Sequence, residues 1–305
     1  MGIGSDLIQA LHQLKTSDEL PPERSVMEIG AQQLAHSFLS SSGELERLAA
    51  LFGVTRPFPL GTADEKREMA HGTLEHLASD APPAQVFWEW LGYRYGSIDV
   101  DTRFNSIPLD LNFDSVPASA KKRYALVTNY GTTEHVANQL NAFKVIHDLT
   151  MLGGLMFHRL PAQGMFNHGL VNYNPKFFWM LCRSNGYSVV NFEFASDTTA
   201  YPLPQNIIDF VGRYTPSASK RLANYRVRDS CLMVVLRKVY DIEFVAPIDV
   251  PTGTESAGPE WTQRYWTVFT PDAFCNFPST KGQIRMRSLL RRFSRIIRGR
   301  SASRA

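Results

Sequence analysis

Acidic and small polar residues follow several short apolar runs of this 305-residue sequence. Because the carboxyl ends of parallel strands meet at one edge of a sheet, side chains in these positions would lie close together. There a glycine lets backbone approach a ligand, a carboxylate after the second strand can accept from a ribose diol, and a polar group after the third can bind an exocyclic amine. This chemistry suits an adenosine-type ligand. The residues concerned are Glu28, Gly30, Asp99, Asp101, Asp110, Asn112 and Asn129.

The segment "NYGTTEH", residues 129–135, changes abruptly from a strand pattern to small polar residues and then to a helical pattern. Open α/β sheets build ligand sites at such junctions. The segment also fits an ordinary strand-to-helix turn in which Thr132 or Thr133 caps the helix. Taken alone, it leaves both interpretations open.

The elements that must position these residues alternate between strands and helices. Such alternation predicts an α/β fold with a mainly parallel sheet. A long polar insert separates the last two strands, which could pair antiparallel at the sheet edge. The patterns predict strands over 26–29, 96–101, 105–112, 123–129, 153–161, 187–195 and 230–239, and helices over 6–16, 32–51, 63–79, 82–96, 132–152 and 174–187.

The composition is that of a globular protein, with 44% hydrophobic and 20% charged residues. No apolar run approaches the ~20 residues of a membrane span, and the first 20 residues do not resemble a secretory signal. The three cysteines, Cys182, Cys231 and Cys275, are far apart in sequence, which argues against a disulfide framework. We therefore expect a cytoplasmic protein in which Cys182 and Cys231 are core residues.

The charge is distributed unevenly along the chain. Residues 281–305 contain Lys281 and eight arginines without an acidic residue, so the rest of the chain is mildly acidic although the net charge is +3. An acidic body argues against a nucleic-acid partner. Within the tail, residues 284–300 have the pattern of an amphipathic helix for an anionic membrane surface. The alternatives are a helix docked on the acidic body and a disordered basic tail.

Several motifs occur in one order along the chain: "SVMEIGAQ", "SIDVD", "LDLN", "YALVTNYGTTEH", "HDLTMLGGLMFHRLP" and "SNGYSVV". Over roughly residues 22–240 the sequence thereby resembles the class I S-adenosylmethionine-dependent methyltransferases, and in particular a bacterial stand-alone type acting on small molecules or glycans. The resemblance implies a Rossmann-like, doubly wound, mostly parallel seven-stranded sheet with a helical insertion after strand one.

The predicted organisation has four parts. Residues 1–21 form an N-terminal helix, and residues 22–250 form the methyltransferase domain, with its helical insertion at about 36–92. A C-terminal extension follows over 251–280, and the basic amphipathic tail occupies 281–305.

The resemblance also implies which residues contact S-adenosylmethionine, and no metal is predicted. Asp99 would bind the ribose, with Asp101 as the second choice. The other implied contacts are Glu28 and Gly30 after the first strand, Asp110 and Leu111 beside the adenine, and Asn129 and Tyr130 at the methionine end.

Four histidines are candidates for a general base toward a hydroxyl acceptor. His168 is preferred because its segment, "QGMFNHGLVNYNP", is rich in Gly, Asn, His and Tyr, and His135 is the second choice. His147 fits a helix C-terminus, and His158 ends a predicted strand. A structural hydrogen bond is the alternative for each.

The sequence therefore predicts a methyltransferase acting on a hydroxyl or amine of a small molecule, glycan or glycolipid intermediate, with a further expectation that it lies on the inner membrane face. One departure supports an alternative. The family's first motif is richer in glycine, whereas here Gly30 is followed by Ala31 and Gln32. The alternative is a non-catalytic Rossmann-like scaffold module in a membrane-associated biosynthetic complex.

Overall fold

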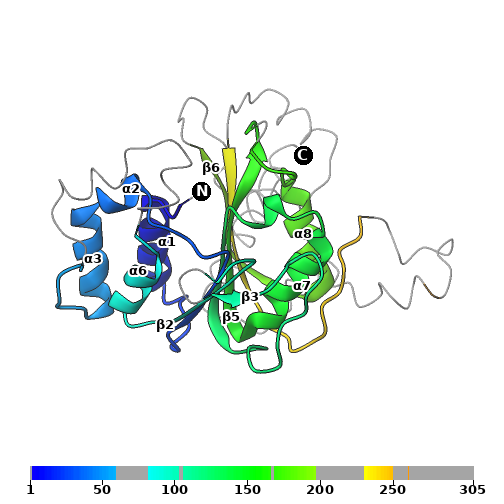
Figure 1. Cartoon of the computed structure of the whole chain (residues 1–305), viewed down its shortest axis with the longest axis horizontal. Helices are drawn as coiled ribbons and strands as arrows, with labels where there is room; N and C mark the ends of the chain where they lie inside the picture. Colours follow the sequence, from blue (N-terminus) through cyan, green and yellow to red (C-terminus); the bar gives the residue numbers. More distant parts are fainter. Residues whose placement is uncertain are drawn as a thin grey trace, which may run out of the picture.

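A seven-stranded sheet with helices on both faces forms the centre of the protein (Figure 1). The computed structural model describes residues 2–59, 82–102, 106–165, 168–196, 230–249 and 260. The predicted helix over 63–79 and the basic tail lie outside these residues. Within the described part, no helix has the length and apolar character needed to cross a membrane.

The strand order is β3-β2-β1-β4-β5-β7-β6, and β7 is antiparallel to both of its neighbours. The other neighbouring pairs are parallel. The predicted mostly parallel seven-stranded sheet and the antiparallel pairing of the last two strands are thus confirmed. The strands are β1 Ser25–Ile29, β2 Arg94–Asp99, β3 Ile107–Pro108, β4 Tyr124–Tyr130, β5 Thr150–Gln163, β6 Ser188–Ser196 and β7 Ser230–Arg237.

Helices cover the sheet in two layers (Figure 1). The first layer contains α1 Ser5–Thr16, α2 His36–Leu39, α3 Ser42–Phe52 and α6 Gln85–Trp90. The second contains α7 Gln139–Leu149 and α8 Pro175–Asn185. Within the interval 36–92, where a helical insertion is predicted, the described residues contain α2, α3 and α6.

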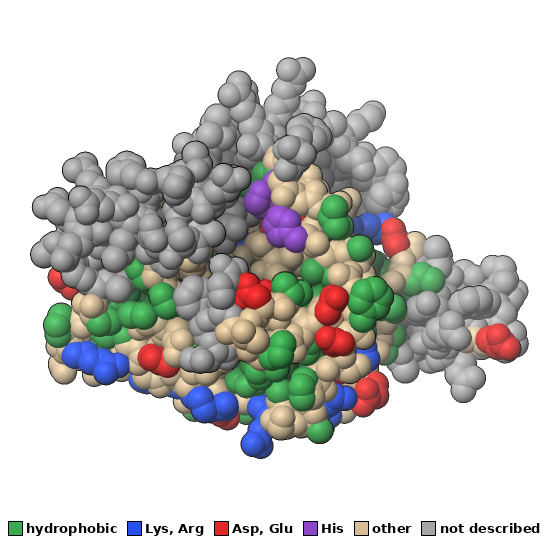
Figure 2. All heavy atoms as spheres, viewed as in Figure 1, with side chains coloured by type: hydrophobic (Ala, Val, Ile, Leu, Met, Phe, Trp, Pro, Cys, Tyr) green, Lys and Arg blue, Asp and Glu red, His purple; other side chains and the backbone are tan. Residues whose placement is uncertain are grey.

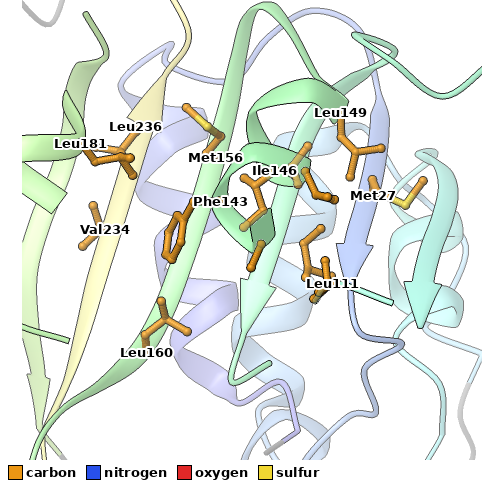
Figure 3. Packing of buried hydrophobic residues seen from close by; sticks show 14 of the residues in the cluster. Met27, Leu111, Phe143, Ile146, Leu149, Met156, Leu160, Leu181, Val234 and Leu236 are labelled. Atoms are coloured by element: carbon orange, nitrogen blue, oxygen red, sulfur yellow. The ribbon is translucent and has the colours of Figure 1, made fainter. Parts of the chain in front are cut away.

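Each layer has its own hydrophobic core because successive side chains of a strand point to opposite faces. In β4, Leu126 packs in the core with α1, α3 and α6, whereas Val127 packs in the core with α7 and α8. Figure 3 shows this second core, where Phe143 and Ile146 of α7 lie over Met156 of β5. Both Cys182 and Cys231 are buried, as predicted.

Several predicted elements differ from the structure. The helix expected over 82–96 is shorter, Gln85–Trp90, and β2 begins at Arg94. The helix expected over 32–51 begins only at residue 36 and is divided into α2 and α3. The strand expected over 105–112 pairs with β2 only at Ile107 and Pro108. The strand expected over 153–161 is longer at both ends, from Thr150 to Gln163.

The helix expected over 132–152 is also divided, into a 3₁₀ helix η2 Thr133–His135 and α7. Asn138 caps α7, because its side chain accepts a hydrogen bond from the backbone N–H of Asn141 at 3.1 Å. The predicted cap at Thr132 or Thr133 is therefore wrong. The hydroxyl of Thr132 instead donates to the carbonyl of Ile29 at 2.6 Å.

Candidate functional site

The turn after β1 contacts the turn after β4 closely. Gly30 adopts φ 74°, and a Cβ atom there would lie 2.5 Å from Oγ1 of Thr132. Gln32 strengthens this contact, because its Nε2 donates to the carbonyl of Gly30 at 3.2 Å and to Oγ1 of Thr132 at 3.1 Å. The position therefore requires glycine for both its backbone angle and its surroundings.

Glu28, whose side chain is buried in β1, is held by three donors. Its carboxylate accepts from Nε1 of Trp88 at 2.8 Å, from the hydroxyl of Tyr95 at 2.8 Å and from the backbone N–H of Gln32 at 3.0 Å. Burial nevertheless raises the pKa of Glu28 to about 7, and the three hydrogen bonds only partly oppose this effect. Glu28 thus joins α6 and β2 to the turn that contains Gly30.

Asp99 ends β2 next to this turn. Its Oδ2 accepts from the backbone N–H of Ala31 at 2.9 Å, and its Oδ1 accepts from the N–H of Val100 at 2.7 Å. The structure therefore brings together two predicted site residues, Gly30 and Asp99, from parts of the chain that are far apart in sequence. Asp101 lies beyond the end of β2.

The segment after β3 contains Asp110 and Leu111. Asp110 accepts from the backbone N–H of Asn112 at 2.8 Å, and its own N–H donates to Asp114 at 2.8 Å. Leu111 is a buried member of the α7–α8 core. Since β3 neighbours β2, Asp110 lies at the same edge of the sheet as Asp99.

Asn129 and Tyr130 occupy the end of β4, and their side chains lie on opposite faces. Asn129 is buried, and its Nδ2 donates to Oγ1 of Thr133 at 2.9 Å. Tyr130 points into the α1 side of the sheet, where its ring stacks on Phe157 with the centroids 5.4 Å apart. The side chain of Tyr130 thus contributes to the core, while Asn129 contacts the segment that follows the strand.

His147 and His158 are buried in the body of the domain. Nδ1 of His147 lies 2.6 Å from the hydroxyl of Tyr187, and its Nε2 lies 2.8 Å from the carbonyl of Ile242. Burial lowers the pKa of His147 to about 4 and that of His158 to about 3. Both rings are therefore neutral near pH 7. The two hydrogen bonds of His147 correspond to the structural role that the sequence offers as the alternative to a general base.

His135 and His168 lie together at the surface, with ring centroids 5.2 Å apart. Figure 2 shows histidine side chains side by side on this face of the molecule. Between them lies Glu134, whose side chain is fully buried. Its Oε1 is 3.5 Å from Nε2 of His168 and 4.0 Å from Nε2 of His135. Burial raises the pKa of Glu134, and the neighbouring His168 partly opposes this effect.

Backbone contacts hold the segment of His168 against Glu134. The carbonyl of Glu134 accepts from the N–H of Leu170 at 2.7 Å and of Val171 at 3.1 Å. Gly169 packs so closely that a Cβ atom there would lie 2.9 Å from Cγ of Glu134. Glu134 is not among the residues predicted for the site, and its position beside His135 was the available sequence signal.

The sheet order defines the class of protein. From β1 the chain continues to β2 and β3 on one side, and β4 then lies on the other side of β1. This reversal between β1 and β4 is the topological switch point of a doubly wound α/β sheet, where ligands bind outside the carboxyl ends of the strands. The protein therefore has a Rossmann-like, doubly wound fold, and Gly30, Asp99 and Asp110 lie at or just after the ends of strands, at the edge of the sheet where ligands of such folds bind.

No protein-family model matches the chain, and no curated protein matches its sequence. Among solved structures, it is similar to a SAM-dependent methyltransferase from Archaeoglobus fulgidus, with 11% identity, coverage of 74% of this chain and 93% of the other, and a TM-score of 0.36. It is also similar to the O-methyltransferase of a trans-AT PKS multienzyme from Brevibacillus brevis, in complex with S-adenosyl-L-homocysteine, with 10% identity, coverage of 88% and 81%, and a TM-score of 0.34. A third is 1,6-didemethyltoxoflavin-N1-methyltransferase from Burkholderia thailandensis, with 11% identity, coverage of 76% and 78%, and a TM-score of 0.37. At such identities and TM-scores, the class of this protein is defined by its own sheet order.

Proposed function

We propose that this protein is an S-adenosylmethionine-dependent methyltransferase that acts on a hydroxyl or amine of a small molecule or glycan. The observation that carries the proposal is the position of Asp99 beside the Gly30 turn. A carboxylate offers about four acceptor positions. Two are used by the N–H groups of Ala31 and Val100, so two remain for the vicinal hydroxyls of a ribose.

The neighbouring residues fit the other parts of the same ligand. From the strand order, Asp110, beyond Asp99, would lie on the adenine side, and Asn129, across the Gly30 turn, would lie on the methionine side. The cofactor supplies an electrophilic methyl group when it is bound. The chain would bind it, align an acceptor with it and exclude water. His168 and His135 are the residues proposed to face the acceptor.

Calorimetric titration with S-adenosylmethionine and S-adenosylhomocysteine tests the proposal. We expect micromolar binding that weakens at least about 10- to 100-fold in Asp99→Ala, because hydrogen bonds to a charged group contribute about 1.5–3 kcal/mol each. Asp241→Ala is the matched control. Asp241 pairs with Lys122 at 2.6 Å. Lys122 lies just before the start of β4, so this pair is at the amino ends of the strands, opposite the proposed ligand site. Equal affinities of the two variants would refute the assigned ribose site.

One observation favours the second candidate, a non-catalytic scaffold module. The space beside Gly30 is occupied by Thr132 and Gln32, so the two turns contact each other directly. A scaffold has no need of an open cofactor site. Absence of binding at millimolar S-adenosylmethionine and S-adenosylhomocysteine would favour this candidate.

We also propose a peripheral membrane position through the basic residues 284–300, which would bring the enzyme to lipid-linked acceptors. The support is the amphipathic pattern of that segment in the sequence. Pelleting with anionic liposomes, which should be lost at high salt and in a 1–280 truncation, tests this position. Equal pelleting of both proteins would contradict it.

A further inference from the structure

Among the residues that the structure describes, none donates a hydrogen bond to the buried carboxylate of Glu134. Its side chain is fully buried, and neither of its oxygen atoms has a hydrogen-bond partner within the described part of the chain. An ionised carboxylate in such surroundings is costly unless it is paired or coordinates a metal. Buried polar groups without a partner are uncommon in native proteins and indicate an interaction that is still to be identified.

Two imidazole nitrogens point at this carboxylate. One ligand atom each from Glu134, His135 and His168 lies within 4.8 Å of the other two. Nε2 of His168 is itself buried and has no hydrogen-bond partner among the described residues. The side chain of His168 is 25% exposed and that of His135 is 47% exposed, so the cluster opens toward solvent on the histidine side.

The distances distinguish a shared ion from a direct ion pair. A charge-assisted N–H···O bond is about 2.7–2.9 Å long, which is shorter than either contact of Oε1. Ligands about 2.0–2.1 Å from a tetrahedral Zn²⁺ ion stand roughly 3.3–3.4 Å from one another. The separation of 3.5 Å between Glu134 and His168 is close to this value, and the separation of 4.0 Å between Glu134 and His135 is somewhat longer, at a ring that is 47% exposed.

We propose that Glu134, His135 and His168 bind a divalent metal ion, and that Zn²⁺ is the ion whose ligand preferences they match. Two imidazoles and one carboxylate are a known donor set of zinc sites that keep a fourth position open. The sequence alone predicts no metal here, because its acidic candidates were assigned to the cofactor and His168 joins the cluster only in the folded chain.

The cluster lies directly beside the ligand-binding edge. Thr133, which precedes Glu134, accepts a hydrogen bond from Asn129 at 2.9 Å and another from the hydroxyl of Tyr173 at 2.8 Å. If the proposed methyltransferase function holds, the open metal position would receive an oxygen atom of the acceptor. The acceptor class would then be hydroxyl compounds that can coordinate a metal through oxygen.

The test uses the full-length protein after removal of metals by a chelator. Calorimetry with ZnCl₂ and the visible absorption spectrum with Co²⁺ measure the site without cofactor or acceptor. We expect one ion per chain, and affinity at least about 10-fold weaker in Glu134→Gln, His135→Gln and His168→Gln, since each loses one of three ligands. His12→Gln is the matched control, because His12 lies on α1 in the other helical layer.

Each outcome decides the proposal. Tight binding that is lost in the three variants and retained in His12→Gln supports it. Absence of binding, or binding that these variants leave unchanged, overturns it. If Glu134→Gln does not fold, the two surface histidine variants carry the test. Titration of the metal-free protein with S-adenosylhomocysteine is independent of this result, so failure of the metal site and failure of the cofactor site can be told apart.

Discussion

Glu28 gives the protein a dependence of stability on pH that a single substitution should remove. Its pKa rises from 4.5 to about 7 in the folded protein, chiefly because the carboxyl is fully buried. Between these two values the folded state holds a proton that the unfolded state has released. The free energy of unfolding must therefore decrease as pH rises through this window.

The size of the effect follows from the two pKa values. At 1.36 kcal/mol per pKa unit, the rise from 4.5 to about 7 corresponds to roughly 3 kcal/mol of stability lost on the alkaline side. Glu28→Gln is neutral at every pH and should lack this loss. Its amide can still accept from Trp88 and donate to Tyr95, but the N–H of Gln32 then faces an NH₂ group, at a cost of about 1 kcal/mol.

Urea unfolding at pH 5, 6, 7 and 8, followed by tryptophan fluorescence, measures both proteins. The difference in unfolding free energy between the natural protein and Glu28→Gln should change by at least about 2 kcal/mol across this range. Glu44→Gln is the control, since Glu44 lies at the surface and accepts from Gln9 at 3.3 Å. A difference that stays constant with pH would refute the inference that Glu28 keeps its proton to neutral pH.

Two further predictions concern a glycine and a buried histidine. Gly30→Ala should destabilise the protein by about 1–3 kcal/mol, because of its positive φ and the contact with Thr132. Gly43→Ala, where a Cβ would meet nothing within 4 Å, should be neutral or slightly stabilising in the same urea assay. His147→Gln should flatten the loss of stability on acidification from pH 6.5 to about 4, because burial lowers the pKa of His147 and only the unfolded state binds a proton in that window. If the melting temperature of His147→Gln falls between pH 6.5 and about 4 as steeply as that of the natural protein, this role of His147 is contradicted.

The sequence predicts the central strands well because their signal is local. β1, β4 and β7 are buried along their whole length, and such strands appear in the sequence as short segments rich in apolar residues. The position of Asp99 beside Gly30 is also predictable, since it follows from the parallel pairing of β1 with β2.

Other features of the fold and the candidate site could not be predicted, because they depend on contacts between residues that are far apart in sequence. Trp88 reaches Glu28 from 60 residues away, and no local pattern marks this pair. The hydroxyls of Thr132 and Thr133 bond to Ile29, Asn129 and Tyr173, so neither caps a helix as its type would suggest. The convergence of His168 on Glu134 likewise requires the folded loop after β5.

The ion pair between Glu19 and Arg237 has a consequence for the order of folding. Arg237 donates to the carboxylate of Glu19 at 2.7 Å and to its carbonyl at 2.6 Å, across 218 residues of sequence. In the same layer, Leu7 and Leu11 of α1 share a core with Val235 of β7. During synthesis, α1 can pack on α2 and α3 early, but the core that these helices share with β7 is completed only after β7 has left the ribosome. Contacts of such long sequence separation require closure of a long loop and therefore slow the completion of the fold.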